Sequence, residues 1–138
     1  MKKIIVFLCL CVCAGVSAMA TEQEELPCNG GTPITANNGT KFCKSNKAMN
    51  WWSAFAWCES QGQGRKLAEF KTMCPSTVQY PTNTDGDCPN LQGLAESGWV
   101  WSSLAYGSDR ALMANLFSGA VRDGTRTDPS HYYFAFCE

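Results

Sequence analysis

The chain has 138 residues, of which 45% are hydrophobic and 17% are charged, and its formal net charge is −1 at pH 7. This length supports one domain with a single hydrophobic core. The balanced charge, with no basic stripe and no basic amphipathic helix, argues against a nucleic-acid partner and against binding to a membrane surface.

The first residues are typical of a signal peptide. Lys2 and Lys3 precede an apolar run over residues 4–12, and Ala18-Met19-Ala20 has the small-x-small pattern of a cleavage site. The run is too short for a comfortable membrane span, although a retained anchor is the alternative. We expect cleavage after Ala20 with no membrane insertion afterwards, a flexible leader over residues 21–27, and one domain over residues 28–138. The protein would then be secreted, periplasmic or on the cell surface.

Six cysteines remain after this cleavage, and an even number in an exported chain predicts three disulfides. They are Cys28, Cys43, Cys58, Cys74, Cys88 and Cys137. The first two flank an expected hairpin, and Cys74 and Cys88 would close a polar loop, but the count alone leaves many connectivities open.

The first half of the chain predicts a hairpin and two helices. Asn37-Asn38-Gly39 is a strong turn signal between short extended pieces. A helix then begins after the N-cap Asn50, and Gly62 and Gly64 end it. Its buried face would hold residues at i, i+3, i+4 and i+7, which are Trp51, Ala54, Phe55 and Cys58. A second, shorter helix is expected over residues 67–73.

The second half predicts strands. A long polar loop over residues 75–90 leads to Trp99-Val100-Trp101, which opens this part. Residues 111–122 read as a hairpin around Ser118-Gly119, residues 122–130 as another polar loop, and residues 132–137 as the last strand. The fold class is therefore α+β.

The chain resembles the C-type lectin-like domain in the form found in exported bacterial proteins. The resemblance runs over residues 28–137 and rests on four landmarks in order. They are Phe42-Cys43, the segment from Trp51 to Cys58 followed by residues 62–68, Trp99-Val100-Trp101-Ser102-Ser103 followed by residues 114–121, and Phe136-Cys137-Glu138. The resemblance implies two helices packed on short antiparallel β-sheets, with disulfide-linked termini. It also implies that Cys58 pairs with Cys137 and Cys28 with Cys43, which leaves Cys74 for Cys88.

The sequence departs from this family where calcium-dependent sugar binding is concerned. Such members use Glu-Pro-Asn or Gln-Pro-Asp together with Trp-Asn-Asp, and this chain has none of them. The nearest piece is Cys88-Pro89-Asn90, in which a cysteine replaces the carboxylate. Calcium-dependent lectin activity is therefore not implied, and we expect no cofactor.

Two sets of polar and aromatic residues are candidates for binding. Asn83, Asp85 and Asp87 place three side-chain oxygens in one loop, as calcium sites do, although a solvated turn is the simpler interpretation. Trp99, Trp101 and Tyr106 could stack on a ligand, and the alternative for the two tryptophans is a core-facing pair. Trp51, Trp52 and Trp57 are expected in the core. The remaining candidates are charged residues of the second half, for which ordinary solvated loops are the alternative: Asp109, Arg110, Arg122 and Arg126, with Asp123 and Asp128 beside them.

Nothing in the sequence favours an enzyme. His131 is the only histidine, and no nucleophile elbow or phosphate-binding glycine loop accompanies it. We expect a non-enzymatic, adhesin-like recognition module that binds a protein or glycan without calcium, through loops over residues 75–91 and 106–130. The alternative is a structural subunit of a surface or pilus-like assembly.

Overall fold

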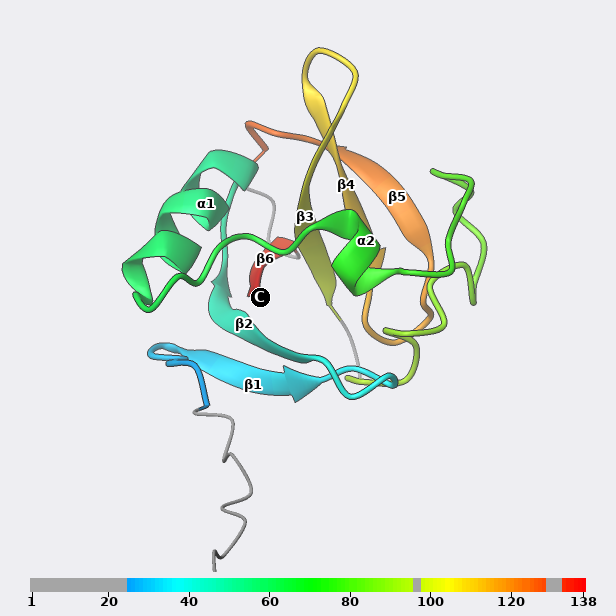
Figure 1. Cartoon of the computed structure of the whole chain (residues 1–138). Helices are drawn as coiled ribbons and strands as arrows, with labels where there is room; N and C mark the ends of the chain where they lie inside the picture. The colour runs from blue at the N-terminus through cyan, green and yellow to red at the C-terminus, as the bar shows by residue number, and fades with distance from the viewer. Residues whose placement is uncertain (1–24, 96–97, 129–132) are drawn as a thin grey trace, which may run out of the picture.

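The computed structural model describes residues 25–95, 98–128 and 133–138, and it has an α+β fold built on one sheet (Figure 1). The expected signal peptide, most of the leader and His131 lie outside the described residues. The strands are β1 (Gly31–Thr35), β2 (Lys41–Ala48), β3 (Trp99–Tyr106), β4 (Arg110–Asn115), β5 (Val121–Thr125) and β6 (Tyr133–Cys137). The helices are α1 (Trp51–Ser60) and α2 (Phe70–Met73).

The six strands have the order β1-β2-β6-β3-β4-β5, so the last strand lies in the middle of the sheet. Four neighbouring pairs are antiparallel, whereas β3 and β6 are parallel. The expectation of several short antiparallel sheets was therefore wrong. Strands β3 and β5 run in the same direction, because each is antiparallel to β4. Strand β6 is parallel to β3, so it also runs in the same direction as β5.

The expected N-terminal hairpin is confirmed. β1 pairs with β2, and Gly39 adopts a φ of 90° in the turn, a conformation that favours glycine. Gly31 is required for another reason, since a Cβ there would lie 2.6 Å from the Lys44 carbonyl oxygen and 2.9 Å from the Trp57 ring. The hairpin thus packs closely against the end of α1.

Helix α1 is confirmed with its cap and its buried face. The Asn50 side chain accepts a hydrogen bond from the Ser53 amide at 2.8 Å, and Trp51, Ala54 and Cys58 are buried. Trp52, however, is 56% exposed, so the expectation that it lies in the core was wrong. It follows Trp51 by one residue, which turns its side chain about 100° around the helix and away from the sheet.

Helix α2 is shorter than expected, because it begins at Phe70 and not at residue 67. Leu67 forms an isolated bridge with Cys137, and the Ala68 amide donates to the Phe136 carbonyl at 2.8 Å. The Ala68 carbonyl in turn accepts from the Ser103 amide at 2.8 Å. The backbone groups of these two buried residues form hydrogen bonds with the strands, so they are not available for the hydrogen bonds of a helix.

The polar loop expected over residues 122–130 was also wrong in its first part. Residues 122–125 belong to β5, which pairs with β4 from Val121 to Thr125. Val121 and Gly124 are buried, Arg122 is exposed, and Asp123 and Thr125 are half-buried, so only part of this edge strand faces solvent.

Alternate residues of the strands belong to two hydrophobic core clusters, which lie on opposite faces of the sheet. Trp101 and Ala135 pack with α1, and Val100 and Phe136 pack in the cluster that contains α2. Phe42 stacks on Phe136 with ring centroids 4.3 Å apart.

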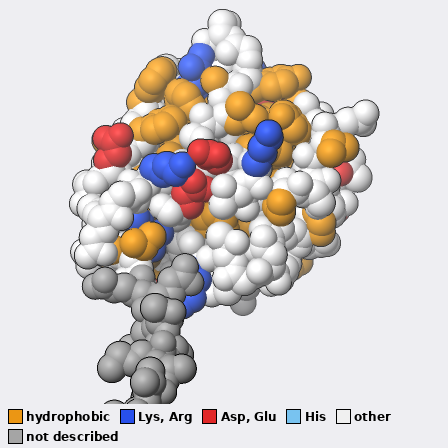
Figure 2. Space-filling view, in the orientation of Figure 1, with side chains coloured by type: hydrophobic (Ala, Val, Ile, Leu, Met, Phe, Trp, Pro, Cys, Tyr) orange, Lys and Arg blue, Asp and Glu red, His pale blue; other side chains and the backbone are white. Residues whose placement is uncertain are grey.

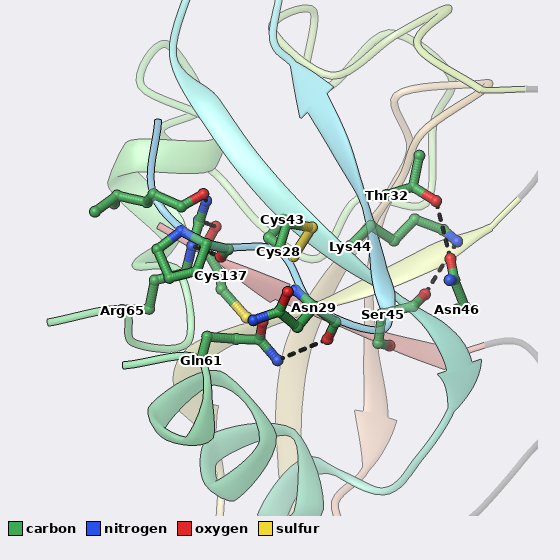
Figure 3. The surroundings of a disulfide bond; sticks show 12 residues. Cys28, Asn29, Thr32, Cys43, Lys44, Ser45, Asn46, Gln61, Arg65 and Cys137 are labelled. Carbon is green, nitrogen blue, oxygen red and sulfur yellow. Dashed lines mark hydrogen bonds between the residues drawn. A yellow bond between two sulfur atoms is a disulfide. The ribbon is translucent and has the colours of Figure 1, made fainter. Parts of the chain in front are cut away.

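All three expected disulfides are present. Cys28–Cys43, Cys58–Cys137 and Cys74–Cys88 have Cα atoms 5.5, 5.5 and 5.1 Å apart, respectively. Figure 3 shows the surroundings of the first bridge, where Asn29 and Gln61 exchange hydrogen bonds of 2.7 and 3.1 Å. The N-terminal hairpin is thereby fastened to the end of α1 as well as bridged internally.

Acidic and basic side chains lie side by side near the middle of the face shown in Figure 2. The ion pairs of Lys66 with Glu69 at 2.8 Å and with Glu138 at 3.0 Å join the segment before α2 to the C-terminal residue. Lys66 takes part in both ion pairs and is 56% exposed, so each pair contributes little to the stability of the fold. None of the helices in the described ranges is long and apolar enough to cross a membrane.

Candidate functional site

The polar loop over residues 75–90 is fixed in place although it contains no helix or strand. Its ends are joined by the Cys74–Cys88 disulfide. Its middle runs beside the end of the β4–β5 hairpin, where the Asn83 amide donates to Val121 and the Gly86 amide donates to Ser118, at 3.0 and 2.8 Å. These two hydrogen bonds attach the loop to the end of the β4–β5 hairpin, although many of its side chains are exposed.

Where this loop meets the sheet, the structure has a hollow of about 470 Å³. Its lining residues come from the loop and from β3, β4, β5 and β6. The lining residues are Pro81, Thr82, Asn83, Trp99, Arg110, Met113, Arg122, Asp123 and Tyr133. We call this feature the polar hollow. It brings together four residues singled out in the sequence, namely Asn83, Trp99, Arg110 and Arg122.

The two arginines of the polar hollow have different partners. Arg110 forms an ion pair with the Asp123 carboxylate through Nε, and its Nη2 donates to the Asp123 carbonyl at 3.0 Å. Arg122 donates through Nε to the Asn83 side-chain oxygen, and its guanidinium carbon lies 5.0 Å from the centre of the Trp99 ring. Asp123 is thus committed to Arg110, and Arg122 is positioned by an amide and an aromatic ring.

The two candidate tryptophans of β3 differ in their exposure to solvent. Trp101 is fully buried, donates from Nε1 to the Met49 carbonyl at 2.9 Å and packs edge-on against Tyr133. Its surface is therefore not accessible to a ligand. Trp99 is half-buried and lines the polar hollow.

Arg126, Asp109 and Tyr106 lie outside the polar hollow. The Arg126 amide donates to the Asp109 carbonyl at 2.8 Å, and its guanidinium carbon lies 5.1 and 5.5 Å from the Trp51 and Trp52 rings. Tyr106 is 40% exposed at the end of β3. The candidates therefore fall into two groups, of which only one surrounds a hollow.

Two of the three side chains in the candidate ion loop already accept a hydrogen bond from the protein. The Asn83 side-chain oxygen accepts from Arg122, and an Asp87 carboxylate oxygen accepts from the Thr84 amide at 3.0 Å. Asp85 is exposed. Across residues 25–95, 98–128 and 133–138 no group of three or more His, Cys, Asp or Glu side chains is arranged to hold a metal ion.

Sequence reasoning did not single out Thr82 and Tyr133 as neighbours of this site, although Thr82 lies in the loop expected to bind a ligand. Asp123 was expected beside Arg122 in a polar loop, whereas both residues belong to β5. Tyr133 enters only because β6 inserts beside β3, which no local sequence signal indicates.

A second hollow of about 490 Å³ lies between residues 25–26, the β1–β2 hairpin, Arg65 and Glu138. It contains none of the candidate ligand-binding residues. The polar hollow is therefore the site on which the sequence and the geometry converge.

No family model matches the chain, and no curated protein is similar to it in sequence. The residues and geometry of the polar hollow are therefore the basis for a proposed function.

Proposed function

We propose that the protein is an exported, non-enzymatic recognition module with a C-type lectin-like fold, which binds a protein or glycan ligand in the polar hollow. Three features support this fold. The Cys58–Cys137 disulfide joins the first helix to β6, the Cys28–Cys43 disulfide bridges an N-terminal hairpin, and Phe136 and Cys137 end β6 directly before Glu138. Three disulfides are typical of an oxidising compartment, which supports a secreted, periplasmic or cell-surface location.

The observation that carries the proposal is the polar hollow itself. A disulfide-closed loop and four strands converge there, and its volume lies within the range of small-molecule binding sites. Because its walls are already fixed by the Cys74–Cys88 disulfide and by backbone hydrogen bonds, a ligand would have little chain to order on binding.

Calcium-independent binding is part of the proposal. The chain lacks the Glu-Pro-Asn and Trp-Asn-Asp motifs with which related sugar binders chelate calcium. The Asn83 oxygen, which could serve as a ligand of the ion, accepts from Arg122 instead. Recognition would rest on hydrogen bonds from arginine, threonine and tyrosine side chains.

The test is a pair of matched substitutions. Thr82 and Ser76 are both exposed residues of this loop, but only Thr82 lines the polar hollow. Thr82→Trp should therefore obstruct the hollow, whereas Ser76→Trp adds the same side chain away from it. We expect the purified protein to bind members of a glycan array or a displayed peptide library, Thr82→Trp to abolish that binding, and Ser76→Trp and a calcium chelator to leave it intact. Equal binding by the two variants would refute the polar hollow as the site.

The alternative, a structural subunit of a surface assembly, gains no support from the sheet edges. Strand β1 carries Pro33, which cannot donate to an added strand, and the outer strand β5 carries Arg122 and Asp123. Proline and charged residues on edge strands disfavour pairing with another chain. We therefore prefer the recognition module.

A further inference from the structure

Arg122 is held in a fixed orientation at the rim of the polar hollow. Its Nε atom donates to Asn83, and its guanidinium carbon lies 5.0 Å from the centre of the Trp99 ring. Asn83 is itself anchored, since its amide donates to the Val121 carbonyl at 3.0 Å. An arginine restrained in this way loses little side-chain entropy when it binds a ligand.

No residue in the described part of the chain engages the two terminal nitrogens of Arg122. Among the described residues, Arg122 forms no ion pair with a carboxylate, and its only side-chain hydrogen bond is the one from Nε to Asn83. The nearest acid in the polar hollow, Asp123, pairs with Arg110. The chain has a net charge of −1, so this unpaired positive group is a local feature and not the consequence of a basic protein.

Planar guanidinium groups bind carboxylates through two parallel hydrogen bonds. The polar hollow also offers hydroxyl groups from Thr82 and Tyr133 beside the half-buried ring of Trp99. Hydroxyl and amide groups beside an aromatic ring suit a polyhydroxylated ring, because they can form hydrogen bonds with its hydroxyl groups.

We infer that the polar hollow binds an acidic monosaccharide unit, whose carboxylate pairs with Arg122 and whose ring hydroxyls contact the loop. The inference rests on the proposed function and narrows its ligand from a protein or glycan to a glycan that carries carboxylates. A uronic acid and a sialic acid share this chemistry, and separate titrations distinguish them.

The experiment is a titration of the full mature chain, followed by NMR or calorimetry, with methyl glucuronide and with N-acetylneuraminic acid. Methyl glucoside is the neutral control, since it replaces the carboxylate of methyl glucuronide by a hydroxymethyl group. We expect the protein to bind at least one acidic sugar more tightly than the neutral one, and added salt to weaken that binding.

Substitutions at Arg122 then test the residue itself. We expect Arg122→Gln to weaken binding of the acidic sugar by about tenfold or more, and Arg122→Lys, which keeps the charge but loses the fork, to lie in between. The matched control is Lys47→Gln, which removes the same charge from an exposed position of β2 outside the polar hollow. Thermal melting of each variant establishes that it is folded.

The inference is overturned if the acidic sugars bind no better than methyl glucoside, if neither binds at millimolar concentration, or if folded Arg122→Gln binds like the wild type. The proposed function fails separately. If Thr82→Trp abolishes the binding of some neutral glycan or peptide while acidic sugars show no preference, the recognition module stands and only the acidic ligand is refuted.

Discussion

At the scale of single residues, Arg65 illustrates how one side chain can join distant parts of the chain. It is only 5% exposed, yet no carboxylate among the described residues forms an ion pair with it. Its guanidinium instead donates to the carbonyls of Leu26, Pro27 and Cys137 at 3.0, 2.7 and 3.0 Å. Burial lowers the pKa of Arg65, and these three acceptors compensate for part of the lost hydration.

Replacing Arg65 by methionine should destabilise the domain, because the change keeps an unbranched apolar stem but removes every one of these hydrogen bonds. Bonds to a charged donor contribute more than neutral ones, so we expect the free energy of unfolding to fall by about 2–3 kcal/mol. Urea denaturation with the disulfides intact would measure this. Lys47→Met, an exposed control, should change it little, and equal stability of the two variants would contradict the role of Arg65.

The residue scale is also where sequence reasoning was weakest. A tryptophan next to a buried tryptophan was expected in the core, but Trp52 is 56% exposed because adjacent helix positions point in different directions. Arg65 gave no sequence signal at all, since its acceptors are backbone carbonyls near both ends of the described chain. Contacts of this kind depend on tertiary structure and cannot be inferred from local patterns.

At the scale of elements, α1 follows the sequence closely because its signals are local. The cap residue, the apolar spacing and the terminal glycines all act within a few residues of one another. The short α2 differs, since the helical pattern of residues 67–73 competes with the sheet. Leu67 and Ala68 hydrogen-bond to strands that arrive much later in the chain, and these long-range bonds prevail.

The cap of α1 offers a direct test at this scale. Asn50→Ala removes the acceptor for the Ser53 amide, and we expect a loss of about 1 kcal/mol in unfolding free energy. Asn50→Asp keeps an acceptor and should remain close to the wild type. Chemical denaturation of the three proteins would decide it. Wild-type stability in Asn50→Ala would mean that packing of Trp51 and Cys58 alone fixes the start of the helix.

At the scale of the whole molecule, the number of disulfides and the α+β class follow from the sequence, and the disulfide pairing was expected from the family resemblance, whereas the arrangement of the sheet was not predicted. Turn signals and period-2 patterns locate strands, but they carry no information on which strands become neighbours. The insertion of β6 between β2 and β3 is such a case. It places Tyr133 beside Trp99, so the polar hollow could be predicted only in part, as a set of loop residues without their common centre.

The disulfides should differ in their contribution according to the length of chain that each closes. Cys58–Cys137 spans a sequence separation of 79 and Cys74–Cys88 one of 14. Loop-closure entropy then predicts a loss of about 4–5 kcal/mol for the double alanine variant of the first pair and about 3 kcal/mol for that of the second. Both pairs are buried, so the loss of packed sulfur atoms adds to each value.

The two double variants should also differ in kind. Loss of Cys74–Cys88 removes the covalent link between the ends of the polar loop over residues 75–90. We therefore expect a protein that still folds, and whose free energy of ligand binding in the polar hollow falls by a larger fraction than its free energy of unfolding. Loss of Cys58–Cys137 separates α1 from the central strand β6, so we expect global destabilisation with a clear fall in melting temperature. Circular dichroism melts and a binding titration on both variants measure these effects. If the Cys74–Cys88 variant lost more stability than the Cys58–Cys137 variant, the closed loop over residues 75–90 would stabilise the domain more than the link between α1 and β6 does.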